Sequence, residues 1–321
     1  LRDDARFYRV EAFLNGEDVR PDIDRKEMHE FAGIDVLHLQ CHFGLDTLSV
    51  ARQAKSVVGV DFSPKAIAAA CDLAKRVGLA DRAEFVLSDL YATPMQVNRQ
   101  FDLVFSTWGT TTWLPDIWRW GEVFAGFVKP GGRAYFADLH PTIAILDEAG
   151  GSLVPRFSWR TPSDQPEVFE EDITYTGAHS KLENKKTVEW THPVSDHLNA
   201  LLNQGLQLEY LHEHEVIPWK LFQCLEGASN RASGAVYYRS AKGKRPNTFV
   251  FFYDVVPALL DRTFYRCRSC PKPWIFVQIT VRSKGATTGP HQRIPIKATT
   301  PCSCPITASP EERRATNHRR L

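Results

Sequence analysis

Apolar residues in the first two thirds of the chain fall into short runs separated by stretches of amphipathic spacing. Each run is about as long as a buried strand, and the last one follows a Pro-Gly-Gly turn. The stretches between the runs are long enough for helices. Repeated strand–helix alternation predicts a parallel sheet with helices on both faces. The expected strands are 34–39, 56–61, 83–89, 101–107 and 128–140.

Helix signals lie between these runs. The stretch after Gly44 has helical spacing at Leu45, Leu48 and Ala51. A second helix begins with Ser63 as its cap and Pro64 at its first position. A third is expected near 116–128, where the indoles of Trp118 and Trp120 would pack it onto the sheet.

The residues that follow the expected strands carry the candidate chemistry, because ligands of such sheets bind beyond the carboxyl ends of the strands. The first strand ends in a turn containing Gly44, and the second ends in Asp61, seventeen residues later. A carboxylate at this distance suits a hydrogen bond to both hydroxyls of a ribose. Asp89, after the third strand, can accept a hydrogen bond from an adenine amine. The sequence therefore predicts an adenosine site.

Five stretches in order resemble the motifs of class I S-adenosylmethionine-dependent methyltransferases, in the branch that acts on small molecules. They read VLHLQCHFGLDTLSVA, VVGVDFSPKAI, AEFVLSDLY, FDLVFSTWGTTTWL and FVKPGGRAYFADLHP. The resemblance covers about residues 7–222, and 187–214 resembles the strand–helix–strand that closes the family's sheet. It implies an α/β, Rossmann-like, seven-stranded, mostly parallel sheet with helices on both faces. It also implies S-adenosyl-L-methionine as cofactor and a small-molecule acceptor.

The first of these motifs departs from the family's pattern of apolar-Asp-apolar-Gly-x-Gly-x-Gly. His38, Gln40, His42 and Gly44 stand at the four characteristic positions, so that only the last glycine is kept. The missing glycines also count against the alternative of a nicotinamide-dependent oxidoreductase.

Site residues follow from the resemblance. Trp113 and His140 are expected near the acceptor, with His140 as a candidate general base. At the N-terminus, Tyr8 or Arg9 is expected to reach the methionine carboxylate. The residues expected to contact the cofactor are Leu39, Gln40, Cys41, Gly44, Asp61, Phe62, Ser88, Asp89, Leu90, Thr107 and Trp108.

Two groups of residues raise the question of metal binding. His38, Cys41 and His42 stand within five positions, but the interpretation favoured here is a modified cofactor turn without metal. Cys267, Cys270, Cys302 and Cys304 include one pair with zinc-knuckle spacing, but the gap between the two pairs exceeds the usual spacing. No metal site is predicted.

Charge divides the chain near Phe222. Residues 1–222 hold 22 Lys+Arg and 33 Asp+Glu, whereas residues 223–321 hold 17 and 5, a change from −11 to +12. We therefore predict a methyltransferase domain over 1–222, with 142–186 as a lid or substrate insertion. Residues 223–321 would be a basic, Cys-containing extension, either disordered or not native to the protein. A second hypothesis makes this extension a nucleic-acid-binding segment, although no recognisable module supports it.

Targeting signals complete the expectations. The charged N-terminal stretch lacks a secretory signal, and no apolar run has the length of a membrane span. A cytoplasmic protein without nucleic-acid or membrane partners is therefore expected. Because the first residue is Leu, the sequence is expected to lack its natural start.

Overall fold

The computed structural model describes residues 7–28, 30–170, 185–214 and 222, and the backbone of 235–241 and 248–252. The chain divides into two compact units, 1–265 and 266–321, of which only the first contains described residues. The cysteine pairs of the expected extension lie outside the described residues.

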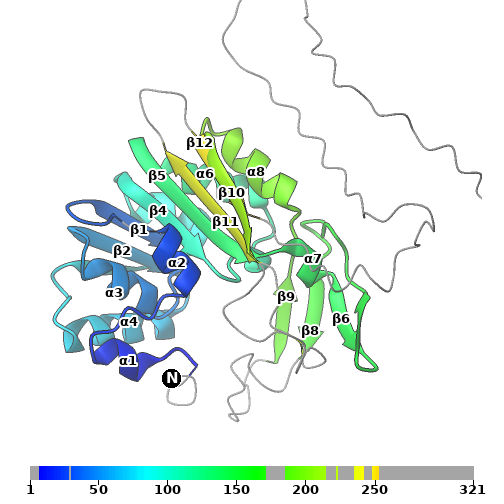
Figure 1. The fold of residues 1–321 in the computed structure, drawn as a ribbon, viewed down its shortest axis with the longest axis horizontal. Coiled ribbons are helices and arrows are strands. Elements are labelled where there is room, and N and C mark those ends of the chain that lie inside the picture. The colour runs from blue at the N-terminus through cyan, green and yellow to red at the C-terminus, as the bar shows by residue number, and fades with distance from the viewer. Residues whose placement is uncertain are drawn as a thin grey trace, which may run out of the picture. The chain divides into compact units, whose positions relative to one another are not determined.

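An eight-stranded sheet forms the centre of the fold, in the order β10-β12-β11-β5-β4-β1-β2-β3. The five strands from β3 to β5 run parallel, which confirms the α/β fold and the strands expected from the apolar runs (Figure 1). The chain reverses its direction of progress across the sheet between β1 and β4. The five strands are β1 (Asp35–Leu39), β2 (Ser56–Asp61), β3 (Ala83–Leu87), β4 (Phe101–Thr107) and β5 (Val128–Leu139).

Alternate residues of these strands enter two different hydrophobic cores, as the two-residue period of a strand requires. Leu37 and Leu39 face one core, whereas Val36 faces the other. Helices α6 (Ile117–Gly126) and α8 (Val194–Leu202) cover the first core. The second core lies under α1 (Val10–Leu14), α2 (Asp22–Glu27), α3 (Leu45–Ala51) and α4 (Pro64–Arg76).

The helix signals in the sequence are matched by the structure. The Ser63 hydroxyl accepts a hydrogen bond from the backbone N–H of Ala66 at 3.2 Å, and Pro64 opens α4. Asp116 caps α6 in the same way. Trp120 is fully buried beneath α6 as expected, but Trp118 is 46% exposed, so the expectation that it packs against the sheet is wrong.

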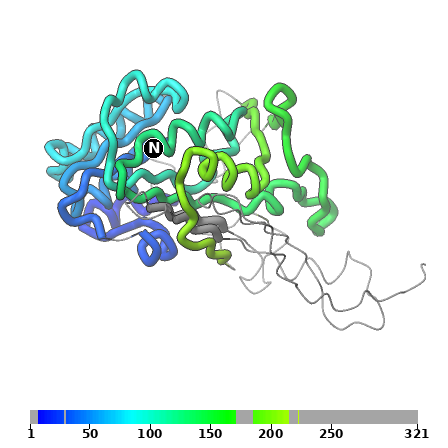
Figure 2. Tube along the Cα trace, turned by 90° about the horizontal axis from the view of Figure 1, so that it is seen from above, coloured from blue at the N-terminus to red at the C-terminus, as the bar shows by residue number. Residues whose placement is uncertain are grey.

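The segment after β5 forms a short helix and two hairpins, which stand apart from helices α1 to α4 (Figures 1 and 2). The helix is α7 (Pro141–Ala144). One hairpin pairs β6 (Leu146–Ala149) with β7 (Ser152–Pro155), and the other pairs β8 (Glu167–Glu170) with β9 (Lys186–Glu189). The expectation that the strand near 187 closes the main sheet is therefore wrong, because β9 pairs only with β8 among the described strands. A lid role for 142–186 stays a prediction.

The other end of the sheet uses chain from beyond Phe222. Strand β11 (Ala235–Ala241) lies antiparallel to β5, and β12 (Thr248–Phe252) lies beside β11. Strand β10 (Leu208–His214) pairs with both of them. The expected seven-stranded sheet is thus not confirmed, and the sheet does not end at Phe222. The position of the domain boundary stays a prediction.

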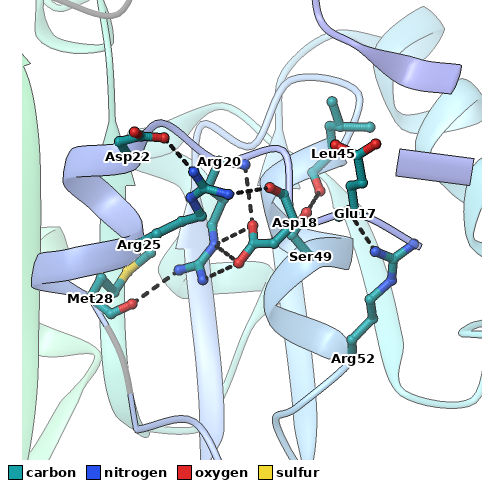
Figure 3. Close-up of polar contacts among 9 residues, drawn as sticks. All are labelled: Glu17, Asp18, Arg20, Asp22, Arg25, Met28, Leu45, Ser49 and Arg52. Carbon is teal, nitrogen blue, oxygen red and sulfur yellow. Dashed lines mark hydrogen bonds and ion pairs between the residues drawn. The ribbon is translucent and has the colours of Figure 1, made fainter. Parts of the chain in front are cut away.

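Polar contacts tie the N-terminal segment to helix α3 (Figure 3). Arg52, next to the end of α3, donates to the backbone oxygens of Phe13 and Glu17 at 2.5 and 2.7 Å. Arg20 is buried, pairs with the carboxylate of Asp18 and donates to the backbone oxygen of Met28. The segment that carries α1 and α2 is therefore fixed beside α3.

Candidate active site

The turn between β1 and α3, residues 40–44, has an unusual backbone. Gln40, His42 and Gly44 all have positive φ, at 58°, 52° and 77°. The left-handed conformation favours glycine, and a Cβ at position 44 would also come within 2.5 Å of the Phe85 ring. This position therefore needs glycine, although the family's other two glycines are absent.

Asp61 lies directly beside this turn. One of its carboxylate oxygens accepts a hydrogen bond from the backbone N–H of His42 at 2.8 Å, and the other accepts one from Ser63 at 2.9 Å. Each oxygen has a further lone pair, so that the carboxylate can still accept hydrogen bonds from two hydroxyls. The neighbouring Phe62 is 71% exposed and offers an aromatic face at the same strand end.

The end of β3 lies next to the end of β2. Leu87 pairs with Asp61, and the backbone N–H of Ser88 donates to the backbone oxygen of Asp61 at 3.0 Å. Asp89 follows, and its carboxylate accepts from the backbone N–H of Tyr91. The structure therefore brings Asp61, Ser88 and Asp89 together, as the sequence predicts.

Other predicted cofactor residues have side chains that are part of the protein interior. Leu39 and Leu90 belong to the hydrophobic core, so that only their backbone is available to a ligand. Cys41 and Thr107 are also buried, and burial holds the pKa of the Cys41 thiol well above its usual value. The Gln40 amide nitrogen donates to the backbone oxygen of Thr110, which links the first turn to the loop after β4.

The loop after β4 is held by Asp138, which the sequence analysis did not identify. Its carboxylate is buried and accepts from the backbone N–H groups of Gly109, Thr110 and Thr111, and from the Thr111 hydroxyl. The hydroxyl of Thr111 also lies 3.0 Å from the Nε2 atom of buried His197. Asp138 is near the end of β5, where strand-end reasoning would have found it.

Trp108 points toward the N-terminal segment. It has a positive φ of 61°, and its indole N–H donates to the carboxylate of Asp24 on α2. The Tyr135 hydroxyl donates to the other oxygen of Asp24 at 2.6 Å. Contact between Trp108 and the cofactor stays a prediction, and Trp113, at 45% exposure, stays a candidate for contact with the acceptor.

Asp24 predicts a pH effect on stability. Burial raises its pKa from 3.8 to about 7, so between these values the folded state holds a proton that the unfolded state has released. The free energy of unfolding should therefore fall as pH rises from about 4 to about 7. Asp24→Asn should flatten this slope, which denaturant unfolding at several pH values measures. An equally steep slope in the variant would assign the effect to another group.

His140 begins helix α7. Its Nδ1 atom accepts a hydrogen bond from the backbone N–H of Thr142 at 3.0 Å, so that in the neutral ring the proton is on Nε2. Burial lowers its pKa to about 4. The ring is therefore neutral at pH 7, and its role as a general base stays a prediction.

The residues that raised the question of metal binding do not converge. The His38 ring stacks on Phe105 with centroids 3.9 Å apart, and its Nδ1 atom lies 2.8 Å from the Thr47 hydroxyl. The thiol of Cys41 instead approaches the backbone oxygen of His42.

The N-terminal segment reaches the same turn. The Tyr8 ring lies 5.0 Å from that of Phe43 and 5.5 Å from that of His42, centroid to centroid. Arg9 pairs with Glu17 at 2.6 Å. Tyr8 is thus placed beside the cofactor turn, and a contact of either residue with methionine stays a prediction.

A doubly wound parallel sheet with a carboxylate after its second strand defines a nucleotide-binding α/β protein. A family model described as "Methyltransferase domain" matches residues 36–132, the stretch from β1 into β5. Residues 36–132 therefore match a methyltransferase domain, and S-adenosyl-L-methionine is the cofactor that this match supports.

Solved structures with a similar fold include three S-adenosylmethionine-dependent methyltransferases. The protein from Mesorhizobium loti is 21% identical, with a TM-score of 0.48, over 70% of this chain and 99% of that one. A putative one from Listeria monocytogenes is 17% identical, with a TM-score of 0.47, over 68% and 95%. That from Clostridium acetobutylicum is 16% identical, with a TM-score of 0.47, over 69% and 88%. No curated protein matches the chain.

A membrane span requires a long apolar helix. None of the helices in the described part of the chain has the necessary length and hydropathy.

Proposed function

We propose that the protein transfers the methyl group of S-adenosyl-L-methionine to a small-molecule acceptor. The observation that supports cofactor binding most directly is the Asp61 carboxylate, which lies beside the positive-φ turn and has lone pairs left for two ribose hydroxyls. Ser88 and Asp89 at the next strand end provide polar groups for the adenine.

Aromatic side chains after β5 support a small acceptor. The rings of Phe157 and Phe169 lie 5.2 Å apart, and that of Trp159 lies 6.5 Å from the ring of His140. The Trp159 side chain is 46% exposed, so part of its surface can meet a ligand. We place the acceptor between these residues and the cofactor, where an in-line methyl transfer depends chiefly on the positioning of the two reactants.

Replacing Asp61 tests the cofactor site. Charge-assisted hydrogen bonds are worth about 1.5–3 kcal/mol each, and 1.4 kcal/mol is tenfold in affinity. Asp61→Ala should therefore weaken binding of S-adenosylhomocysteine at least about tenfold in a calorimetric titration. Titration with NADH should show no binding, and NADH binding would instead support the oxidoreductase alternative.

A matched control separates binding from folding. Asp72→Ala removes the same charge from an exposed position on α4 and should leave the affinity unchanged. Because Asp61 also holds two backbone N–H groups, thermal unfolding of both variants should accompany the titrations. An unchanged dissociation constant in Asp61→Ala would remove Asp61 from the site.

A further inference from the structure

Three side chains capable of binding a metal meet where α2 approaches β10. Glu27 is the last residue of α2, whereas His212 and His214 are alternate residues of β10 and so project from the same side of the strand. One ligand atom from each residue lies within 4.8 Å of the other two. This cluster is distinct from the cofactor residues described above.

The distances suit a single small ion. The Nδ1 atom of His212 lies 3.2 Å from the Oε1 atom of Glu27, and the Nε2 atom of His214 lies 3.9 Å from the same oxygen. Ligand atoms about 2.1 Å from a tetrahedral zinc ion stand about 3.4 Å from one another. The three side chains therefore need only small movements to bind one ion.

The surroundings favour the metal-binding form of both rings. Burial lowers the pKa of His212 and of His214, and the charge that each would carry is further disfavoured by His214 and by Lys26, respectively. Neutral imidazole is the form that binds metals. The Tyr210 ring stacks on His212 with centroids 4.5 Å apart, which restricts the orientation of the imidazole. The positive charge of Lys26 acts against a bound cation, but this side chain is exposed to solvent.

We propose that Glu27, His212 and His214 form a binding site for a divalent transition-metal ion, for which Zn²⁺ is the best fit. Two imidazoles and one carboxylate are a ligand set of zinc proteins, and three protein ligands leave a fourth position for water or another oxygen ligand. Since Glu27 and His212 are 185 residues apart in the chain, the ion would join the N-terminal segment to the far part of the sheet.

Strand pairing places the site at the ligand-binding edge of the sheet. His214 pairs with Ala235, which in turn pairs with Leu139 at the end of β5. Strands are about 4.8 Å apart, so the backbone of His214 is about 10 Å from that of Leu139. The proposed metal site therefore lies at the same edge as Asp138 and His140.

The test uses the full chain, freed of metal by a chelator and titrated with Co²⁺ and then with Zn²⁺. The wild-type protein should bind one Co²⁺ with visible absorption typical of nitrogen and oxygen ligands, and Zn²⁺ should displace it. Zn²⁺ should also raise the melting temperature, because an ion that binds the folded state stabilises it. The double variant His212→Ala, His214→Ala should lose both effects.

Two further variants make the result specific. Glu27→Gln changes little in size and should weaken binding at least tenfold, which guards against a double variant that fails to fold. Glu213→Gln removes a carboxylate between the two histidines, on the opposite side of β10, and should bind as the wild type does. Metal binding that persists in the double variant, absorption typical of thiolate ligands, or no binding at all would overturn the proposal.

Discussion

Ending the chain after Phe222 is expected to lower the melting temperature by more than about 10 °C, whereas ending it after Tyr265 should leave it nearly unchanged. The shorter chain lacks β11, which pairs with β5 along Arg133–Leu139. It also lacks β12, so that β10 loses both strands with which it pairs among those described. Lost hydrogen bonds at about 1 kcal/mol each sum to several kcal/mol, and each kcal/mol shifts the melting temperature of a domain of this size by about 2–4 °C.

Loss of β11 also changes the exposed surface. Without it, β5 becomes an open sheet edge, which invites pairing with other chains. Leu208 and Leu211 of β10 pack against both hydrophobic cores and would no longer be held there by strand pairing. The shorter chain should therefore also aggregate more readily than the longer one.

Thermal unfolding of the two truncated chains, with titration of S-adenosylhomocysteine, measures the effect. The longer chain serves as the control, because it keeps every described strand. Limited proteolysis of the full chain provides an independent measure. A resistant core that ends between Phe222 and Asn230 and still binds S-adenosylhomocysteine would instead establish the boundary near Phe222 that charge predicts.

The parallel half of the sheet was predictable because each strand is a separate apolar run. For β1, β2 and β4 nearly every side chain is buried, so composition alone distinguishes these strands from their surroundings. Strand β11 reads AVYYRSA within a basic stretch, and nothing local shows that it pairs with β5 about one hundred residues earlier. The pairing of β9 with β8 is likewise a long-range choice, which local pattern does not record.

The candidate site divides in the same way. Asp61 was predictable because its place after β2 and its distance from Gly44 are properties of the local sequence. Asp24 was not, since its partners Trp108 and Tyr135 lie 84 and 111 residues away. Glu27 could not be linked to the histidines of β10 for the same reason. Contacts between distant segments need the folded chain, and these include much of what shapes the site.

Asp138→Ala is expected to reduce both stability and cofactor binding, because this carboxylate holds the loop that joins β4 to α6. Its removal leaves the N–H groups of Gly109 and Thr111 without their present acceptor in a buried setting. A buried donor left unsatisfied costs about 1–3 kcal/mol, so the folded state should lose about 3 kcal/mol or more. The variant loop should be free to move away from the cofactor turn, to which Thr110 is joined by Gln40.

Affinity for S-adenosylhomocysteine should accordingly fall at least about tenfold in Asp138→Ala. Asp164→Ala, which removes a carboxylate from an exposed position, is the matched control and should behave as the wild type. Asp138→Asn adds a second comparison: its carboxamide keeps one acceptor oxygen but turns a donor toward the loop, so it should rescue stability only in part. Denaturant unfolding and calorimetry on the three variants measure these effects. Wild-type affinity in Asp138→Ala, with stability reduced, would show that the loop after β4 does not contribute to cofactor binding.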